Sequence, residues 1–480
     1  MSILVVDVGT SGVRAAIVRP DATIAVEHYR EVLPDSPDAG LVEFDARVLG
    51  DVTLELARAA LAEGGPVDAV GITNQRASAV VWDRATGEPV GPALGWQDLR
   101  TVGDCLVLQA EGLRLAPNQS ATKVGWLLNT YDPDRTRDLC FGTPDTWIAW
   151  QLSGGALHVT DLSNAGVTGL IDLDASEWDD RVLDQLRIPR SMMPTIVDST
   201  SVLGPATALE GAPPIAGILG DQQSSMLGQG VVAPGPAKIT FGTGGMLDLV
   251  VGPDRPGFDT RGGGGTFPIV AWRRDGVATW GLEAIMLSAG TNVEWLRDDL
   301  GILETSAQSH DVASQCDTTD GVVYVPALMG LGTPRWDYGA RGTLLGLTRG
   351  AGRPQIVRAV LEGIAQRGAD LVDAAETDGA PRIAAIRIDG GMSRNPTFVQ
   401  ALADATQRPV EVSPFIEATT MGAAYAAGLA MGTWAGLDDI AAIWQPRSSV
   451  EPGAPLDRAR WAQAVDRAAA WFPELSGLDF

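Results

Sequence analysis

Lysine, histidine and cysteine are scarce in this chain of 480 residues, which contains two lysines, three histidines and three cysteines. The cysteines, Cys105, Cys140 and Cys316, are far apart and show no C-x-x-C spacing. This spacing argues against a disulfide framework or a zinc site and favours a reducing compartment. The histidines are equally dispersed, so neither a histidine-based metal centre nor a Ser-His-Asp set can be identified. Arginine is plentiful, and we attribute the shortage of lysine to coding bias.

Long hydrophobic runs are also lacking. The apolar run at the start is interrupted by Asp7 and Arg14 and follows no basic residue, which is not the pattern of a signal peptide. The least charged later stretch, 421–437, is rich in Ala and Gly and falls short of a membrane-spanning helix. We expect it to form a buried helix packed closely against backbone. These patterns predict a cytoplasmic protein without a membrane partner.

Positive charge is in deficit, with 35 basic against 60 acidic residues and a formal net charge of -25. Such a surface repels nucleic acid, so nucleic acid is not an expected partner, although a local cluster of donors can still bind a small anion. With 45% hydrophobic and 20% charged residues, the composition is that of a folded globular protein. Because the chain exceeds what one hydrophobic core usually supports, two or more domains are expected.

One pattern is present twice, in residues 3–18 and again in residues 239–251. Each copy has an apolar run, then Gly-Thr with another Gly close behind, then a second apolar run. This is typical of a β-hairpin with glycines where positive φ is needed. Hydroxyl and N–H groups of such turns converge on anions, so we predict two similar domains facing each other across phosphate. The predicted phosphate-binding residues are Thr10, Ser11, Arg14, Thr243 and Gly244.

Strand and helix patterns alternate along the rest of the chain, which predicts α/β architecture. Asn395 is expected to cap a helix whose first residue is Pro396. The segment 232–236, Val-Ala-Pro-Gly-Pro, is the predicted boundary between domains 1–232 and 233–480. No G-x-x-x-x-G-K-[ST] sequence occurs, so a P-loop is excluded. The expected strands are 67–73, 79–82, 215–219 and 383–388, and the expected helix is 356–372.

Three further features carry chemistry, each beside an ordinary structural alternative. Asp7 ends the first strand and is placed to hold Mg²⁺ through water, or simply to cap the turn. Asp221 follows an apolar strand, where carboxylates face the ligand crevice, and could serve as the base that phosphoryl transfer requires. Its alternative is a helix N-cap. The glycines of Asp389-Gly390-Gly391 would let backbone approach a flat ligand such as adenine, or form a common strand-to-helix turn.

Together with other motifs, these features resemble the FGGY family of carbohydrate kinases, and within it most of all the glycerol kinases. The resemblance covers nearly the whole chain, and the segment 342–362 fits the family's C-terminal signature at every constrained position. The remaining motifs, in order, are Asp7-Val-Gly-Thr-Ser-Gly-Val-Arg14, Gly71-Ile-Thr-Asn-Gln-Arg76, Trp82-Asp83, Gly95-Trp-Gln97, Ser120-Ala-Thr-Lys-Val-Gly-Trp126, Phe141-Gly-Thr-Pro-Asp-Thr-Trp147, His158-Val-Thr-Asp161, Gly220-Asp-Gln-Gln223, Phe241-Gly-Thr-Gly244, Tyr324-Val-Pro-Ala327, Gly330-Leu-Gly332, Ala340-Arg-Gly342 and Asp389-Gly-Gly391.

The resemblance implies an actin-like, ribonuclease H-type fold of two domains that close over Mg-ATP and a small polyol or sugar. It makes Asp221 the general base, with Arg76 and Gln222 holding substrate hydroxyls and Trp96 forming an apolar wall. The residues that it assigns to ATP and its metal are Thr10, Ser11, Arg14, Thr243, Gly244, Gly290, Gly391 and Asn395, with Asp7 near Mg²⁺. A family glutamine in the nucleotide site is Glu294 here, and this position is left unassigned.

The chain departs from the glycerol kinases in the acceptor pocket. Where glycerol kinases carry a glutamate and a tyrosine that grip glycerol, this chain has Ala77 and Asn118. An aromatic residue that they carry after the second Gly-Thr-Gly turn is replaced by Met246. Losing a carboxylate that accepts two hydroxyl hydrogen bonds removes about 1.5–3 kcal/mol for each bond. A small-polyol kinase is still favoured over a xylulokinase-type ketose kinase, because the segment 71–76 is similar to that of glycerol kinases. It is favoured over an inactive actin-like nucleotide sensor because Asp221 is in place. The sequence determines neither the identity of the substrate nor whether the protein forms a homo-oligomer.

Overall fold

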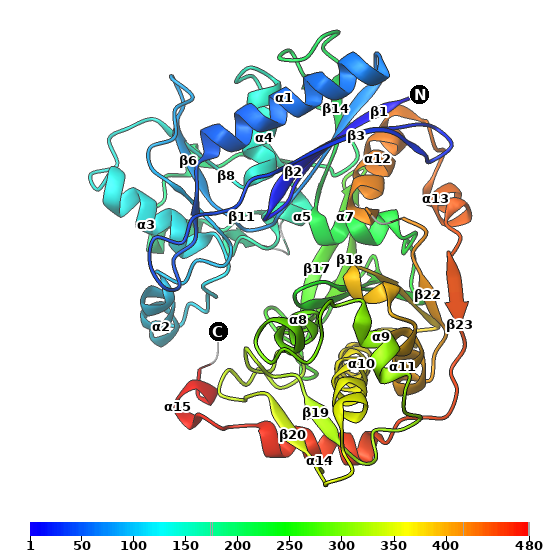
Figure 1. The fold of residues 1–480 in the computed structure, drawn as a ribbon. Helices are drawn as coiled ribbons and strands as arrows, with labels where there is room; N and C mark the ends of the chain where they lie inside the picture. Colours follow the sequence, from blue (N-terminus) through cyan, green and yellow to red (C-terminus); the bar gives the residue numbers. More distant parts are fainter. Residues whose placement is uncertain (173, 175, 416, 479–480) are drawn as a thin grey trace.

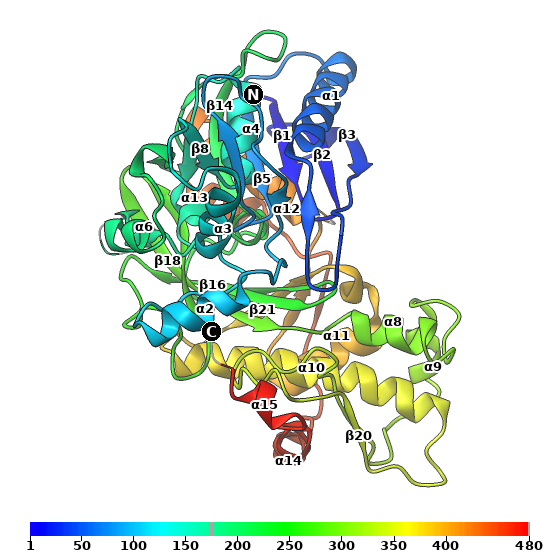
Figure 2. The ribbon, with the colours of Figure 1, turned by 90° about the vertical axis from the view of Figure 1, so that its left-hand side faces the viewer.

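Two mixed β-sheets, one from each half of the chain, form the framework of the computed structural model (Figure 1). The structure describes residues 1–172, 174, 176–415 and 417–478. Within this part of the chain, none of the helices combines the length and apolarity needed to cross a bilayer. The two sheets lie one above the other in Figure 2, with the N-terminus on the upper one.

The first sheet has six strands in the order β13-β14-β5-β1-β2-β3. Its three central strands, β1, β5 and β14, are parallel, and β2, β3 and β13 are antiparallel to their neighbours. The strands are β1 (Ile3–Val8), β2 (Gly12–Val18), β3 (Ile24–Glu31), β5 (Ala69–Asn74), β13 (Gly204–Pro205) and β14 (Pro214–Gly220).

The second sheet repeats this arrangement with one additional edge strand. Its order is β17-β18-β16-β15-β21-β22-β23, where β15, β21 and β22 are parallel and the other pairs are antiparallel. The strands are β15 (Pro236–Phe241), β16 (Gly245–Gly252), β17 (Phe267–Arg274), β18 (Val277–Met286), β21 (Ala385–Asp389), β22 (Val410–Val412) and β23 (Ser448–Val450). Both predicted hairpins are therefore confirmed, as β1–β2 and β15–β16. The repeated topology is that of two ribonuclease H-like domains, as expected.

Helices cover the outer faces of both sheets. Helices α1 and α4 share a core with the first sheet, whereas α10 and α11 share one with the second. The predicted cap of α11 is confirmed, because the Asn395 side chain accepts a hydrogen bond from the Phe398 amide. The helices are α1 (Ala46–Gly64), α2 (Val102–Ala110), α3 (Ala121–Tyr131), α4 (Pro144–Leu152), α5 (Leu162–Ala165), α6 (Asp180–Gln185), α7 (Asp221–Gly228), α8 (Thr291–Asp298), α9 (Gln308–Ala313), α10 (Arg353–Thr377), α11 (Pro396–Thr406), α12 (Ala418–Met431), α13 (Leu437–Ile443), α14 (Arg458–Ala468) and α15 (Pro473–Ser476).

Short elements complete the connections. All four predicted strands are present, as β5, β6, β14 and β21, and the predicted helix lies within α10. The short elements are β4 (Glu43–Phe44), β6 (Val80–Asp83), β7 (Ala93–Leu94), β8 (Leu139–Gly142), β9 (Val159–Asp161), β10 (Ile171–Asp172), β11 (Glu177–Trp178), β12 (Thr195–Val197), β19 (Val323–Val325), β20 (Thr343–Leu345) and the 3₁₀ turns η1 (Arg190–Met192) and η2 (Gly391–Arg394).

Helix α12 belongs to the part of the chain predicted as the second domain, yet it packs on the inner face of the first sheet. A Cβ on Gly71 of β5 or on Gly217 of β14 would lie 2.4–2.5 Å from backbone atoms of α12, so glycine is needed for this approach. This confirms a buried helix packed against backbone. It ends at Met431, earlier than predicted, because Gly432 adopts a left-handed C-cap conformation with φ of 73°.

Candidate active site

The two hairpin turns place Gly9-Thr10-Ser11 and Gly242-Thr243-Gly244 at equivalent ends of their sheets. The predicted reason for their glycines is wrong, because none of these turn glycines has a positive φ. Close approach of other backbone explains Gly12 and Gly244, whereas a Cβ on Gly9 or Gly242 would meet nothing closer than 3.6 Å. A Cβ on Gly12 would meet the Arg30 carbonyl oxygen at 2.6 Å, and one on Gly244 would meet the Met286 carbonyl oxygen at 2.8 Å.

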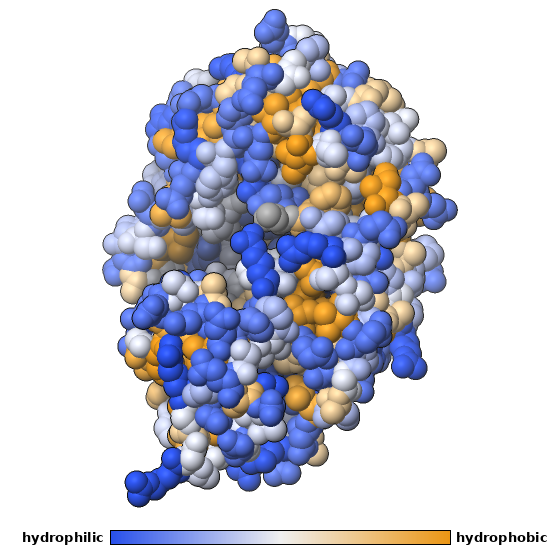
Figure 3. Space-filling view, turned by 45° about the vertical axis from the view of Figure 1, so that its right-hand side comes forward, coloured by the Kyte–Doolittle hydropathy of each residue, from blue (hydrophilic) through white to orange (hydrophobic). Residues whose placement is uncertain are grey.

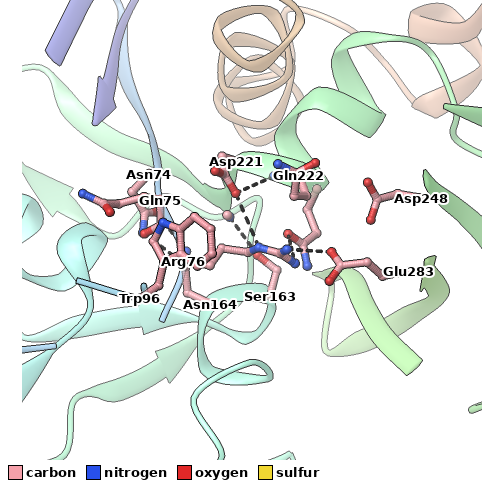
Figure 4. A network of polar contacts seen from close by, with 12 residues as sticks. Asn74, Gln75, Arg76, Trp96, Ser163, Asn164, Asp221, Gln222, Asp248 and Glu283 are labelled. Carbon is pink, nitrogen blue, oxygen red and sulfur yellow. Dashed lines mark hydrogen bonds and ion pairs between the residues drawn. The ribbon is translucent and has the colours of Figure 1, made fainter. Parts of the chain in front are cut away.

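Arg76 and Asp221 lie together between the two sheets (Figure 4). Arg76 follows β5, and its Nε is 3.4 Å from Oδ1 of Asp221, the first residue of α7. The Arg76 guanidinium also reaches across to the second sheet, where Nη2 donates to Oε2 of Glu283 at 2.6 Å. A single buried cation therefore contacts carboxylates of both halves of the fold.

The Asp221 carboxylate does not cap α7. Gly220 occupies the N-cap position, and the carboxylate accepts a 2.8 Å hydrogen bond from the Gln222 amide. Burial raises the pKa of Asp221 above its usual value, and the positive charge of Arg76 opposes that shift. The exposed fraction of the Asp221 side chain is 30%, so an acceptor hydroxyl can reach it.

A layer of buried polar side chains fixes the strand ends behind this pair. The Asn74 and Asn164 amides exchange hydrogen bonds of 3.0 and 3.1 Å, and Ser163 Oγ accepts from the Gly220 amide at 3.0 Å. The Asp161 carboxylate in turn accepts from Ser163 and Asn164. The start of α7 is thus held to the end of β5, which keeps Asp221 beside Arg76.

Asp7 and Arg14 pair across the first hairpin, where the sequence predicts phosphate and metal to bind. Arg14 Nη1 is 3.9 Å from the Asp7 carboxylate and forms an ion pair with Glu417, just before α12. Arg14 Nε is buried and has no hydrogen-bond partner among the described residues. That nitrogen faces Glu27, whose Oε2 is 3.6 Å away, so the carboxylates of Asp7, Glu27 and Glu417 surround the guanidinium.

The surroundings of Asp7 fit a magnesium ion that arrives with the nucleotide. Its closest hydroxyl donor, Thr420 Oγ1, is 3.5 Å away, and burial raises the pKa of Asp7 to about 7. The described residues contain no group of three or more His, Cys, Asp or Glu side chains that could hold a metal. Mg²⁺ commonly binds one or two carboxylates and takes its other ligands from water and phosphate, so one carboxylate suffices here.

The second-domain residues predicted to line ATP are only partly brought together by the contacts in the structure. The Gly290 amide donates to Gly242 at 2.8 Å and the Ala289 amide donates to Thr243 at 2.8 Å, which places Gly290 against the second hairpin turn. Gly391 is exposed at the start of η2. The Asn395 side chain is engaged at both ends, since it accepts from Phe398 and donates to Ser309 at 2.9 Å.

The residues predicted to bind the acceptor surround the Arg76 loop. Trp96 Nε1 donates to Thr10 Oγ1 at 3.1 Å, which ties its ring to the first hairpin turn. Ala77 is buried with φ of 60°, and its carbonyl accepts from Ser120 Oγ at 2.9 Å. That bond links the loop to the turn that contains the exposed Asn118.

Gln222 and Met246 approach the site from its other side. The Gln222 side-chain oxygen accepts a 2.6 Å hydrogen bond from Lys238 Nζ. Any bond from Gln222 to an acceptor oxygen would therefore come from its amide nitrogen. Met246 is half-buried on β16, opposite Thr240 on β15.

Lys238, Asp248 and Glu283 were missed by the sequence reasoning. Each is a buried charged residue on a strand of the second sheet, and Lys238 Nζ lies 2.8 Å from Asp248 Oδ2. A signal was available, because each interrupts an apolar strand and Lys238 is one of only two lysines. The other, Lys123, is also fully buried and donates to the carbonyl oxygens of Pro117 and Gln119 at 2.7 and 3.1 Å.

Comparison with known proteins agrees with this architecture. Residues 2–228 match the N-terminal domain model of the FGGY family of carbohydrate kinases, and residues 237–431 match the C-terminal domain model of that family. A glycerol kinase of Aromatoleum aromaticum is 40% identical over 98% of this chain and 99% of the relative. A glycerol kinase of Gloeobacter violaceus is 40% identical over 98% of this chain and 97% of the relative.

Two solved structures are similar over nearly the whole chain. The glycerol kinase of Plasmodium falciparum with ADP has a TM-score of 0.90 at 28% identity, covering 97% of this chain and 98% of the other. A xyloylose kinase from Brucella ovis has a TM-score of 0.85 at 25% identity, covering 100% of both. The two-domain fold is therefore shared with kinases of both a polyol and a sugar.

Proposed function

We propose, from the premise that the chain belongs to the FGGY family of carbohydrate kinases, that it phosphorylates a small polyol at the expense of ATP. It is an enzyme, a phosphotransferase with an alcohol group as acceptor, and its cofactors are ATP and Mg²⁺. The observation that supports the site assignment is the Arg76–Asp221 pair, 3.4 Å apart between the two sheets. Nothing in the comparisons supports an inactive sensor.

In the proposed mechanism, Asp221 accepts the proton of the attacking hydroxyl. Bound Mg-ATP supplies the phosphoryl group together with charge neutralisation on its oxygens. Arg76 and the Gln222 amide orient the acceptor, and the Trp96 ring covers its carbon atoms. Positioning of this kind carries most of the catalysis in phosphoryl transfer, because the transition state requires little covalent chemistry from the protein.

We assign the nucleotide to the two hairpin turns. Thr10, Ser11 and Arg14 would hold phosphate oxygens from the first domain, and Asp7 would hold the Mg²⁺ that accompanies them. The second-domain contribution comes from Thr243, Gly244, Gly290, Gly391 and Asn395. Asn395 acts through its place at the start of α11, since its polar atoms already bond within the protein.

The acceptor is proposed to be a polyol that differs from glycerol in length or substitution. Ala77 leaves the pocket without the carboxylate that its glycerol kinase relatives are expected to carry there, and Met246 and Asn118 alter two further walls. A ketose is the second candidate, favoured by the likeness to the xyloylose kinase structure. The likeness to the glycerol kinases, 40% over almost the whole chain, keeps the polyol ahead.

A product assay distinguishes these acceptors. ADP release with Mg-ATP is measured over three- to six-carbon polyols and over pentuloses, with no acceptor as the blank. The polyol assignment requires the highest kcat/KM for a polyol. A pentulose with the highest value would identify a ketose kinase, and no acceptor-dependent ADP release with any compound would refute the kinase assignment.

Ala77→Glu tests the altered pocket directly. The introduced carboxylate should raise kcat/KM for glycerol about tenfold or more, since a hydrogen bond to a charged group contributes roughly 1.5–3 kcal/mol. Ala77→Gln has the same length without the charge and controls for filling the pocket. Equal kcat/KM values for the two variants would show that the missing carboxylate does not set the preference.

A further inference from the structure

The inner face of the second sheet carries buried charges directly opposite Asp221. Side chains alternate along a strand, and on β15 Ala237, Ile239 and Phe241 point into the core beneath α10. Lys238 therefore points to the other face, toward α7. By the same alternation, Asp248 on β16 lies on that inner face, between core residues Leu247 and Leu249.

Lys238 contacts groups on both sides of the boundary between the domains. Its Nζ lies 2.8 Å from the Asp248 carboxylate and donates to Thr240 Oγ1 at 3.1 Å on its own sheet. It also donates at 2.6 Å to the side-chain oxygen of Gln222, in the first turn of α7. Lys238 and Asp248 are both fully buried, so neither the charge nor the hydrogen bond is weakened by water.

A chain of charges continues from Asp248 to the acceptor site. Burial and the negative charge of the nearby Asp248 raise the pKa of Glu283, whose carboxylate receives the 2.6 Å bond from Arg76. Arg76 in turn lies 3.4 Å from Asp221. Figure 4 shows Arg76 between Asp221 and Glu283, with Asp248 beyond them. Asp221 and its neighbour Gln222 are thus held from two directions by the second sheet.

We propose that Lys238 is a positioning residue for phosphoryl transfer: its bond to Gln222 fixes the first turn of α7, and with it the Asp221 carboxylate, while Asp248 provides the countercharge. The inference rests on the proposed role of Asp221 as the base. It predicts that the second domain controls the geometry of the base as well as binding the nucleotide. If the Lys238–Asp248 pair were purely structural, removing both of its charges together would leave kcat unchanged.

The double variant Lys238→Met/Asp248→Leu separates these roles, because it removes both charges and keeps the volume apolar. Apolar replacement of a buried ion pair is often neutral for stability. We expect a near wild-type melting temperature and a dissociation constant for an ATP analogue within about twofold of wild type. We expect kcat to fall about ten- to hundredfold, as for loss of one hydrogen bond to a charged group.

Arg367→Met is the matched control in the same domain. Arg367 is buried on α10, on the opposite face of the sheet, where Nη1 contacts Asp370 Oδ2 at 2.7 Å. Loss of this cation should lower the melting temperature without changing kcat. A double variant that keeps wild-type kcat would overturn the proposal, as would an equal loss of kcat in the control.

Gln222→Met gives a second measurement in case the double variant does not fold. Gln222→Met leaves Lys238 paired with Asp248 but removes both the contact to α7 and the amide proposed to orient the acceptor. Gln222→Glu loses the same amide and keeps an oxygen for Lys238, so the kcat of Gln222→Met is expected to be tenfold or more below that of Gln222→Glu. Equal kcat values for the two variants would refute the positioning role. All comparisons use the acceptor with the highest wild-type turnover. Absence of any wild-type turnover would refute the proposed function itself, a result distinct from failure of this inference.

Discussion

Replacing Gly422 by alanine is expected to push α12 away from α7, the helix that begins at Asp221. At Gly422 on α12, an added Cβ would lie 1.7 Å from the Ser224 carbonyl oxygen on α7. The contact is reciprocal, since a Cβ on Gly228 of α7 would lie 1.9 Å from the Ala418 carbonyl oxygen. These neighbours are backbone atoms that cannot rotate away, so the helices themselves must move.

The size of the effect follows from the geometry. The 1.7 Å approach must grow to at least 3.0 Å, below which real Cβ contacts essentially never occur. Overpacking of a close-packed interior costs about 1–3 kcal/mol, whereas Gly to Ala inside a helix gains at most about 1 kcal/mol. Subtracting the full gain from this cost leaves a net destabilisation of about 0–2 kcal/mol. Because α7 begins at Asp221, its displacement should also lower kcat.

Thermal unfolding and ADP release measure the two consequences. For a cooperative unit of 150–250 residues, each kcal/mol lowers the melting temperature by about 2–4 °C. Gly125→Ala is the matched control, because Gly125 lies inside α3 and its added Cβ would be no closer than 3.8 Å to Leu186. That variant should be as stable as wild type or more so. A Gly422→Ala protein that melts at or above wild type with full kcat would refute the close-crossing explanation.

Three other outcomes are expected. Asp221→Asn should lower kcat by about 10²–10⁴-fold with an unchanged dissociation constant for an ATP analogue, and a normal kcat would show that Asp221 is not the base. Burial raises the pKa of the Asp145 carboxyl group to about 7. The folded state therefore binds the carboxyl proton more tightly than the unfolded state does, and the free energy of unfolding falls as pH rises from about 4 to 7. Asp145→Asn should reduce that fall in melting temperature, and an unaltered slope would contradict the assignment. An ATP analogue with acceptor should lower the radius of gyration in small-angle scattering, and no compaction would count against domain closure.

Much of the fold could be predicted because its signals are local. The hairpins β1–β2 and β15–β16, the strand before Asp221 and the Asn395 cap are each determined by residues a few positions apart. The length of α12 was less predictable, since the apolar Ala and Gly run continues past Gly432, where the backbone turns left-handed. The role of the hairpin glycines was also out of reach, because the atoms that approach Gly12 and Gly244 belong to Arg30 and Met286.

The sequence by itself determined the reaction class, through the series of motifs that it shares with the FGGY family of carbohydrate kinases, among them the carboxylate of Asp221. Only the tertiary structure decided what surrounds that carboxylate. Arg76 and Glu283 are 207 positions apart in the chain, and their 2.6 Å bond exists only because the two sheets face each other. We attributed the shortage of lysine to coding bias, and only the structure shows where the two lysines lie. Both lysines are fully buried where they bond to groups on other segments, and burial is a property of packing rather than of local sequence.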